Sequence, residues 1–476
     1  MKWSKYQEAI FQAVVHEDKH LLITARAGSG KTTTLVHAMD LTQNPDRALV
    51  AHNKHIATEL KTRTTADVRT LHSMGFQAIR DHVRHSVNVV TGKGYTIARK
   101  VVEDRIKLPK NKEEHAVYRR LPETVKRLAS LIKGTGPTGI HEVEELVWEH
   151  SLYLENYPAR VLADLAIEAC QRALADEKNI DFDDMLYFPK KFNYTPRQYR
   201  VVAVDESQDL NKVQLWLIAN AAERLIFVGD EQQAIYDWRG AESKLLKQVS
   251  AKLNATELPL SITYRCATDI VDHVKSLFPK LSDFTAREGA PKGEVKYAQN
   301  NALKPSDGDF VLCRWNAPLV KHAMDLMLRG DRVCLVGRNI AKQLQAVFAP
   351  CKETTELGIL HWIATTEAKE VNILQREFRV SQIARVQDKY NILRNIAKSG
   401  RDVKRTLGAL FVDVAEPGAI TLSTIHRAKG LEADRVWLLE DGLKYPGVSE
   451  AEDNVQYVGI TRARETLVRV EASKKK

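Results

Sequence analysis

The sequence has few cysteines, few aromatic residues and no long apolar run. Five of its 476 residues are cysteine and 7% are aromatic. No cysteine forms a Cys-x-x-Cys pair or adjoins a histidine cluster, which argues against a zinc or iron–sulfur site and favours a reducing compartment. No run reaches the ~18 apolar residues of a membrane helix, and the N-terminus lacks an apolar export segment. We therefore expect a cytoplasmic protein that does not bind membranes, with its cysteines in the core.

Length and charge indicate a protein of several domains with a polyanionic partner. The chain carries 71 Lys and Arg against 61 Asp and Glu, a formal net charge of +10. Its length corresponds to about three domains. The basic excess favours nucleic acid as the partner, although a merely soluble basic protein has the same composition.

One short segment predicts a phosphate-binding loop. It reads Ala25-Arg26-Ala27-Gly28-Ser29-Gly30-Lys31-Thr32. It follows the apolar run Leu21–Ile23 and precedes a helix expected over Thr33–Met39. Glycines let backbone amides close around phosphate oxygens, and the helix start adds positive partial charge. Lys31 is expected to bind the terminal phosphates and Thr32 to bind Mg²⁺. Ala25 replaces the usual first glycine, and the loop alone is compatible with a kinase, a GTPase or a motor.

Two carboxylates follow a second apolar run and predict hydrolysis. Val201–Val204 reads as a buried strand that ends in Asp205 and Glu206. Asp205 is placed to hold Mg²⁺ through its water shell, and Glu206 to take a proton from the attacking water. With Lys31 upstream, these acids favour nucleotide hydrolysis.

Polar residues follow other expected strands of the same sheet. Asn53-Lys54 comes after Ala48–Ala51, and a second polar cluster contains Thr70, His72 and Ser73. Ligands of open parallel sheets bind at such strand ends, although ordinary loops and helix caps explain these residues equally well.

The strand Leu225–Asp230 leads into a further candidate site. Gln233 lies where a side chain can sense a terminal phosphate. Trp238 beside Arg239 offers a stacking face next to a cation, which suits an unpaired base. Alternatively, Trp238 is a core anchor.

The chain divides into two α/β halves, each with a helical insertion. Residues 1–80 and 181–262 form the first half around an insertion at 81–180, and Ile180–Leu186 is expected to return the chain to the sheet. Residues 263–340 and 416–476 form the second half around a short insertion at 341–415. Expected strands of the second half are Phe310–Cys313, Val333–Val336, Ile420–Ser423, Val436–Leu439 and Leu467–Val470. Lys and Arg recur in the first insertion, as a solvated face or as a phosphate-tracking surface.

The motifs, in their order along the chain, resemble the superfamily 1 DNA helicases of the UvrD/Rep/PcrA type. The matching segments are Gln7, Ala25–Thr32, Asn53-Lys54, Thr70–Gly75, Asp205–Asp209, Val228–Ala241, Tyr264-Arg265, Thr424–Glu432 and Tyr457–Ala463. The resemblance implies two RecA-like parallel-sheet P-loop domains with ATP and Mg²⁺ between them. It further implies movement on single-stranded DNA, typically 3′ to 5′, coupled to unwinding at junctions with duplex, in DNA repair or replication.

The resemblance also implies roles for individual residues. Gln7 and Tyr264 correspond to adenine contacts, and Glu432, with Gly430 close by, to the ribose contact. Lys31, Thr32, Asp205 and Glu206 correspond to the hydrolytic set. Gln233, Arg265 and Arg462 correspond to γ-phosphate sensors, and arginines of the second half supply charge only when the two halves close. DNA contacts are implied for Asn53, Lys54, Thr70, His72, Ser73, Trp238, Arg239, Thr424 and His426.

Departures from the family pattern keep alternatives open. Ala51 and His52 replace an aromatic stacking residue, and Arg26 replaces a glycine. The second insertion is much shorter than in typical members, so the chain resembles a short form. One alternative is therefore an ATPase that moves on single-stranded DNA and remodels protein–DNA complexes without separating strands. Another is a DNA-binding module with an inactive nucleotide site, against which Lys31, Asp205, Glu206 and Arg462 argue.

Overall fold

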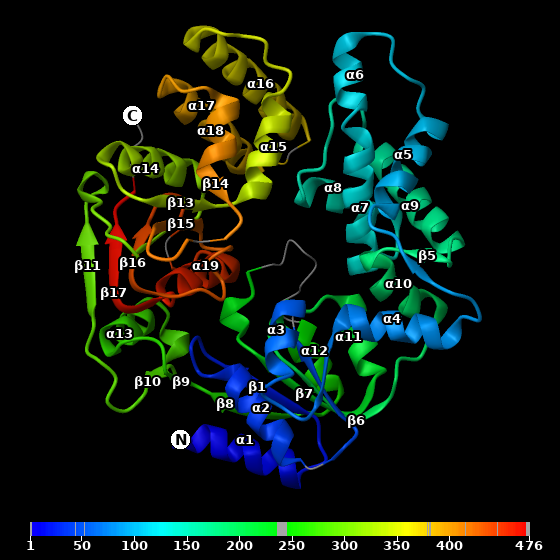
Figure 1. Cartoon of the computed structure of the whole chain (residues 1–476), viewed down its shortest axis with the longest axis vertical. Coiled ribbons are helices and arrows are strands. Elements are labelled where there is room, and N and C mark those ends of the chain that lie inside the picture. Colours follow the sequence, from blue (N-terminus) through cyan, green and yellow to red (C-terminus); the bar gives the residue numbers. More distant parts are fainter. Residues whose placement is uncertain are drawn as a thin grey trace. The chain divides into compact units, whose positions relative to one another are not determined.

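The computed structural model describes residues 2–42, 44–51, 53–235, 245–377, 379, 382–414, 416–444 and 446–472. The chain forms two compact units (Figure 1). Unit 1 comprises Met1–Arg26 and Gly30–Ser261, and unit 2 comprises Ala27–Ser29 and Ile262–Lys476. Each unit is built on a large parallel sheet, which confirms the predicted α/β class. Within the described ranges, every helix is too short or too polar to cross a membrane.

The sheet of unit 1 has six parallel strands. Their order is β3 (Asp67–Thr70), β2 (Arg47–Ala51), β6 (Tyr199–Val204), β7 (Ala222–Gly229), β1 (Leu21–Ala25) and β8 (Thr256–Leu260). The central segments of the inner strands are apolar because both faces of the sheet are covered, which is why their sequences predicted them. Charged residues such as Arg47, Arg200 and Arg224 lie near the starts of these strands. Pro259 is tolerated in β8 because β8 is an edge strand.

Helices cover both faces of this sheet. One core contains residues of α1 (Lys5–His16), α2 (Lys31–Leu41) and α3 (Lys54–Leu60), and the other contains residues of α4 (Leu71–His82), α10 (Phe182–Phe192), α11 (Lys212–Ala219) and α12 (Leu245–Lys252). The carboxyl ends of β1, β6 and β7 lie at one edge because the three strands are parallel and paired in register. The phosphate loop and the two acids follow these ends.

A helical region with its own core lies between β3 and β6 in the sequence. It contains α5 (Lys93–Arg105), α6 (Lys112–Tyr118), α7 (Leu121–Thr135), α8 (Ile140–Glu149) and α9 (Ala159–Ala175), and α7 packs against α5, α8 and α9. Buried charged side chains connect this helical region to α10. Lys93 Nζ and Lys133 Nζ both donate to the Asp184 carboxylate, at 2.8 and 2.6 Å, and all three side chains are buried.

The predicted return to the sheet at Ile180–Leu186 is wrong. Asn179–Ile180 forms β5, which pairs with β4 (Asn88–Val89) in a separate two-stranded sheet. Helix α10 begins at Phe182, because Asp181 caps it and accepts a hydrogen bond from the Asp184 amide at 2.9 Å.

The sheet of unit 2 has seven parallel strands. Their order is β11 (Glu294–Ala298), β17 (Ala463–Val470), β16 (Ala433–Leu439), β12 (Phe310–Cys313), β15 (Ile420–Thr424), β13 (Val333–Val336) and β14 (Phe411–Val412). The five predicted strands of this half are confirmed, whereas the edge strands β11 and β14 were not predicted. A short pair, β9 (Ile262–Thr263) and β10 (Thr285–Ala286), forms a separate two-stranded sheet.

The helices of unit 2 fall into two groups. Those packed on the sheet are α13 (Thr268–Leu277), α14 (Asn316–Arg329) and α19 (Glu450–Ile460). Those of the second insertion are α15 (Arg338–Phe348), α16 (Glu356–Arg376), α17 (Ile383–Lys398) and α18 (Val403–Leu410). The predicted core role of the cysteines is confirmed, because Cys170, Cys266, Cys313, Cys334 and Cys351 are all buried and unpaired with one another.

Candidate active site

The phosphate loop joins β1 to α2 through two left-handed glycines. Gly28 and Gly30 have φ of +69° and +79°, which L-residues with a side chain rarely adopt. Gly30 is the N-cap of α2. Ala25 is buried at the end of β1, and the amide of Arg26 donates to the Leu260 carbonyl at 3.0 Å. The loop backbone is therefore fixed in the turn that precedes Lys31.

The residues that follow Gly28 place two polar groups at the loop. Ser29 Oγ is buried and has no hydrogen-bond partner among the described residues. Lys31 is 9% exposed, and its Nζ lies 3.2 Å from Glu206 Oε1. Burial alone would lower the pKa of Lys31, but the nearby carboxylates raise it overall. Lys31 is therefore a fixed cation, and the unsatisfied Ser29 hydroxyl is compatible with a ligand at this loop.

The two predicted acids lie directly after β6. Thr32 Oγ1 donates to Asp205 Oδ2 at 2.5 Å, and the Glu206 amide donates to Asp205 Oδ1 at 2.9 Å. Glu206 itself is left-handed, with φ of 51° and ψ of 40°. A non-glycine residue in this region carries about 1 kcal/mol or more of strain. In this conformation the Glu206 carboxylate lies 3.2 Å from Lys31 Nζ.

A chain of side-chain hydrogen bonds extends from Glu206 to Gln233. Gln208 Nε2 donates to Glu206 Oε2 at 2.6 Å, and the Asp230 amide donates to Gln208 Oε1 at 3.1 Å. Gln233 Nε2 in turn donates to Asp230 Oδ2 at 2.7 Å. A Cβ on Gly229 would lie 2.8 Å from Gln208 Oε1, so a larger residue there would displace the Gln208 carboxamide. A role for Gln233 was predicted from the sequence, whereas none was predicted for Gln208 or Asp230. Gln208 lies four residues after the predicted strand Val201–Val204, and Asp230 ends the predicted strand Leu225–Asp230.

Gln7 lies beside the phosphate loop. Its Nε2 donates to Thr34 Oγ1 at 2.9 Å, and its Oε1 accepts from the Ser4 amide at 3.0 Å. Its Nε2 is 3.9 Å from an ideal Cβ built on Gly30. The carboxamide is therefore held in one orientation next to the loop, and its role as an adenine contact stays a prediction.

Replacing Asp205 with Asn is expected to stabilise unit 1 by about 1 kcal/mol at neutral pH. Burial, and then the charge of Glu206, raises the pKa of Asp205. A carboxyl whose pKa is higher in the folded state opposes folding when ionised, so this penalty is present at neutral pH and disappears as the pH falls through the raised pKa. Thermal unfolding of Asp205→Asn and of the wild type between pH 4 and 8 measures the difference. A gain in stability that was equal at every pH would contradict the assignment.

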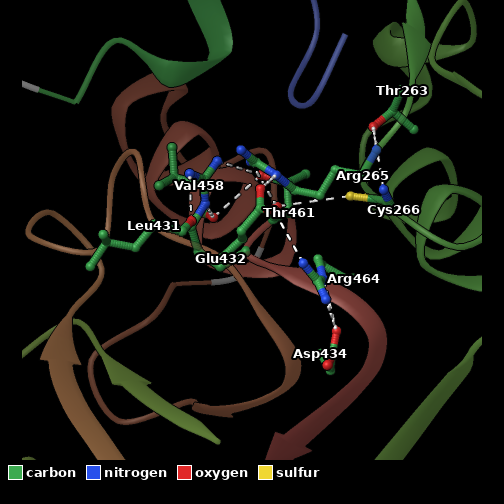
Figure 2. Close-up of polar contacts among 10 residues, drawn as sticks. Thr263, Arg265, Cys266, Leu431, Glu432, Asp434, Val458, Thr461 and Arg464 are labelled. Atoms are coloured by element: carbon green, nitrogen blue, oxygen red, sulfur yellow. Dashed lines mark hydrogen bonds and ion pairs between the residues drawn. The ribbon is translucent and has the colours of Figure 1, made fainter. Parts of the chain in front are cut away.

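In unit 2, Arg265 forms an ion pair with Glu432 (Figure 2). Arg265 Nε donates to Glu432 Oε2 at 2.5 Å, and Arg265 Nη1 donates to the Thr461 carbonyl at 3.3 Å. Arg464 lies 3.5 Å from Glu432 Oε1 and 2.5 Å from Asp434 Oδ1. The structure thus brings two predicted residues, Arg265 and Glu432, together and adds Arg464, which sequence analysis missed. Glu432, the predicted ribose contact, therefore pairs with the guanidinium groups of Arg265 and Arg464.

Arg462 is 1% exposed and is among the largest fully buried side chains of the chain. Its Nε donates to the Val458 carbonyl at 2.9 Å, its Nη1 to the Leu431 carbonyl at 3.2 Å and its Nη2 to Thr461 Oγ1 at 3.2 Å. These bonds fix the guanidinium between the turn that precedes β16 and the end of α19.

The other predicted residues of unit 2 differ in accessibility. Tyr264 is 44% exposed, Gly430 is exposed and left-handed with φ of +88°, and Thr424 is buried at the end of β15. His426 is half-buried, and burial together with nearby cations lowers its pKa to about 3. Its imidazole is therefore neutral at neutral pH.

One of the cations near His426 is Arg314, which sequence analysis missed. It follows β12 directly, and its Nη2 lies 3.5 Å from Glu452 Oε1. A basic residue at the carboxyl end of a predicted strand was the available signal.

Three of the predicted DNA contacts of unit 1 form helix caps. Asn53 Oδ1 accepts from the Ile56 amide at 2.9 Å at the start of α3, and Lys54 is exposed beside it. Thr70 and Ser73 form a capping box at the start of α4, with backbone-to-hydroxyl distances of 3.3 and 3.1 Å. The ring of His72 lies 6.1 Å from that of Phe182. The alternative of ordinary caps therefore accounts for Asn53, Thr70 and Ser73, and their DNA contacts stay predictions.

Three residues of the sequence analysis lie outside the described residues. They are His52, Trp238 and Arg239. Stacking and groove contacts at these positions stay predictions.

Comparisons with known proteins place the chain in a family. Residues 6–254 match the UvrD/REP helicase N-terminal domain, and residues 419–470 match the UvrD-like helicase C-terminal domain. A probable DNA helicase II homolog of Rickettsia conorii is 29% identical over 323 residues, covering 60% of this chain and 47% of that protein. The ATP-dependent DNA helicase PcrA of Bacillus subtilis is 27% identical over 301 residues, covering 55% and 37%. The matches thus span less than half the length of these relatives.

A parallel sheet whose carboxyl edge carries a glycine loop, a buried lysine and two acids defines a P-loop protein of the RecA-like class. The chain belongs to the UvrD/REP helicase family, as its sequence resemblance indicated.

Proposed function

We propose that this chain is an ATP-dependent DNA helicase that moves on single-stranded DNA. The observation that carries the proposal is the arrangement at the carboxyl edge of the six-stranded sheet. There Lys31 lies 3.2 Å from Glu206, and Thr32 donates to Asp205 at 2.5 Å. A cation for the terminal phosphates, a metal ligand pair and a base thus lie together after β1 and β6, two parallel strands that β7 separates in the sheet. The names of the two relatives, probable DNA helicase II homolog and ATP-dependent DNA helicase PcrA, support the same activity.

The residues at this edge fit a nucleotide with Mg²⁺. Thr32 Oγ1 and Asp205 Oδ2 are hard oxygen ligands that already lie side by side. Mg²⁺ bound there would neutralise charge on the phosphate oxygens. Glu206 would accept a proton from the attacking water, and Gln208 orients its carboxylate through a 2.6 Å hydrogen bond. Gln233, held by Asp230, would sense the terminal phosphate.

Unit 2 would supply positive charge to the γ-phosphate, so closure of the two units would depend on ATP. Arg265 and Arg462 would bind the γ-phosphate when the two units close on the nucleotide, with Tyr264 and Gln7 on the adenine and Glu432 on the ribose. Hydrolysis removes the γ-phosphate contact, so the closed state loses its stabilisation and the units separate. In this proposal Arg265 exchanges its ion pair with Glu432 for the phosphate.

The remaining predicted residues would contact the DNA strand. We assign residues 81–180 and 341–415 as insertions on two motor domains, and the separate core of α5, α7, α8 and α9 supports the first of these. The strand would contact both motor domains through the residues named above and move 3′ to 5′ toward a junction with duplex.

Unwinding of 3′-tailed, 5′-tailed and blunt duplexes with ATP tests this function. We expect the 3′-tailed duplex to be separated and the other two to stay intact. Omission of ATP is the control. Separation of the 5′-tailed duplex alone would reverse the assigned direction.

The short second insertion favours a second candidate, a translocating ATPase that strips proteins from DNA. This region contains the helices α15–α18, of which α16 buries only Ile363 and Leu374. Displacement of streptavidin from a biotinylated single strand, without separation of a forked duplex, would select this candidate. Absence of any phosphate release with DNA present would instead indicate an inactive nucleotide site.

A further inference from the structure

A groove of about 330 Å³ lies in unit 2, lined by residues of α14 and by residues of α18 and the turn before it. Its floor is apolar, because the buried side chains of Met324 and Leu410 line it. Met327 and Ala409 also line it and are exposed to solvent. Methionine side chains adapt their shape to irregular apolar partners. The groove is therefore suited to roughly one or two bulky apolar side chains of a ligand.

The apolar surface continues beyond the groove along α14. Met324, Met327 and Leu328 have the spacing i, i+3 and i+4, so they lie on one face of the helix. Leu328 is 75% exposed and Met327 is 41% exposed. An apolar stripe that leads from a groove onto the open surface is typical of a surface that binds a helix.

Two arginines that line the groove have no partner in the part of the chain that the structure describes. Arg401 and Arg405 are exposed, and neither guanidinium makes a hydrogen bond or an ion pair with a described residue. Other exposed arginines of unit 2 do have acidic partners, since Arg338 pairs with Asp413 at 2.8 Å. The guanidinium groups of Arg401 and Arg405 are therefore available to a carboxylate of a ligand.

The carboxylate in the groove is already used by α18. Among the lining residues within the described ranges, Asp402 alone is acidic. Asp402 is the N-cap of α18, and its Oδ1 accepts a hydrogen bond from the Arg405 amide at 2.6 Å. Two guanidinium groups thus face one carboxylate, and the groove carries a net positive charge. Charge complementarity calls for an acidic ligand with an apolar part.

The lining favours an acidic protein segment over nucleic acid. Unpaired bases bind by stacking on aromatic rings, and no aromatic ring is among the lining residues that the structure describes. A phosphate could bind Arg401 or Arg405, but its base would find no ring on which to stack. An amphipathic helix with leucines beside glutamates, in contrast, would place apolar side chains in the groove and carboxylates on the arginines.

We propose that this groove is a docking site for an acidic amphipathic segment of a partner protein. Its apolar side chains would lie against Met324 and Met327, and its carboxylates would pair with Arg401 and Arg405. This docking site is separate from the proposed function, because none of its lining residues belongs to the nucleotide site or to the predicted DNA contacts. A bound segment would contact α14 and α18 together, and so connect the sheet-packed part of unit 2 with its second insertion.

Fluorescence anisotropy with a labelled acidic peptide tests the proposal. The probe is a peptide of about four helical turns with Leu at every third or fourth position and Glu elsewhere, and a matched peptide has Lys in place of Glu. The wild type should bind the Glu peptide and not the Lys peptide. Arg401→Gln combined with Arg405→Gln should weaken binding of the Glu peptide by about three- to tenfold, because two exposed ion pairs are lost. The difference should shrink as salt is raised.

Two further variants separate the charged and the apolar contributions. Arg338→Gln is the matched control, since Arg338 is an exposed arginine of α15 that pairs with Asp413 outside the groove, and it should bind the Glu peptide like the wild type. Met327→Glu should weaken binding of the Glu peptide, because it places a negative charge beside the apolar floor. ATP hydrolysis without DNA and the thermal midpoint should be unchanged in every variant, which shows that each is folded.

Three results would overturn the docking site. One is failure of the wild type to bind the Glu peptide, and another is equal affinity of the wild type and the double arginine variant for it. The third is a loss of oligo-dT affinity in the double variant as large as the loss of peptide affinity, which would assign the arginines to nucleic acid. None of these results alters the unwinding expected of the wild type on a 3′-tailed duplex, so the proposed function is tested separately.

Discussion

Lys31→Ala is expected to lower DNA-stimulated ATP hydrolysis by at least about 100-fold. Lys31 is 9% exposed, and its ammonium lies 3.2 Å from Glu206, so its charge is held at the loop before any nucleotide arrives. Removal of the cation leaves the acids at this edge without their counter-charge and leaves the terminal phosphates unbound. Phosphate release measured with saturating single-stranded DNA and ATP gives the effect.

Lys61→Ala is the matched control, because Lys61 is an exposed lysine at the end of α3 that lies outside the site. It should hydrolyse ATP at the wild-type rate. Thermal unfolding with and without ATP separates binding from folding, since a ligand that binds the folded state raises the midpoint. The wild type should be stabilised by ATP and Lys31→Ala should not. Retained hydrolysis in Lys31→Ala would remove the phosphate loop from the mechanism.

The sequence predicts the central strands and not the edges of the sheets. β1, β6 and β7 are buried on both faces and therefore appear as continuous apolar runs. β11 is an edge strand with charged residues at Glu294 and Lys296 and with Tyr297 68% exposed, so it has no such run. β14 has only two residues. Edge strands depend on their pairing partner, which a local pattern does not contain.

The misassigned segment at Ile180–Leu186 has a local cause. Its apolar residues fit a strand at first sight, but the Asp181 side chain and the Asp184 amide close the first turn of α10. Asp184 then turns inward to two buried lysines. An aspartate three residues after another was the capping signal, and the lysines that stabilise it are 91 and 51 residues away in sequence.

The candidate site likewise contains residues that the sequence predicts and residues that it does not. The residue types of Lys31, Thr32, Asp205 and Glu206 are dictated by phosphate and metal chemistry, so the motif predicts them. Gln208 lacks such a signature, and the 3.1 Å hydrogen bond that it accepts from the Asp230 amide depends on how β6 and β7 lie in the sheet. The left-handed backbone of Glu206 is likewise a property of the folded turn.

The arginines of unit 2 show why a role cannot be assigned from residue type alone. Arg265 and Arg462 were both predicted as phosphate sensors, but Arg265 is paired with a carboxylate and Arg462 with carbonyls. An arginine bound to neutral acceptors keeps its full charge, whereas one bound to Glu432 must exchange partners. We therefore expect Arg265 to respond to the nucleotide state and Arg462 to act as a fixed cation.

Glu206→Gln is expected to lower the rate of hydrolysis by about 100- to 10,000-fold while nucleotide binding is kept. The amide has the size of the carboxylate but cannot accept a proton from water at neutral pH. Its oxygen can still accept the hydrogen bond from Gln208, so the chain to Asp230 and Gln233 is preserved. The variant should therefore bind ATP, close on it and remain closed.

Single-turnover hydrolysis and DNA binding with ATP, measured together, test this expectation. Glu257→Gln is the control, since Glu257 on the edge strand β8 accepts from Thr24 Oγ1 at 2.7 Å, away from the acids at the loop, and it should hydrolyse ATP normally. Glu206→Gln should hold DNA in its ATP-bound form for many times the wild-type lifetime, because the γ-phosphate contact that would stabilise the closed state is not removed. Hydrolysis at the wild-type rate would show that another group accepts the proton. Loss of ATP binding would show that Glu206 acts through Lys31 and not on water.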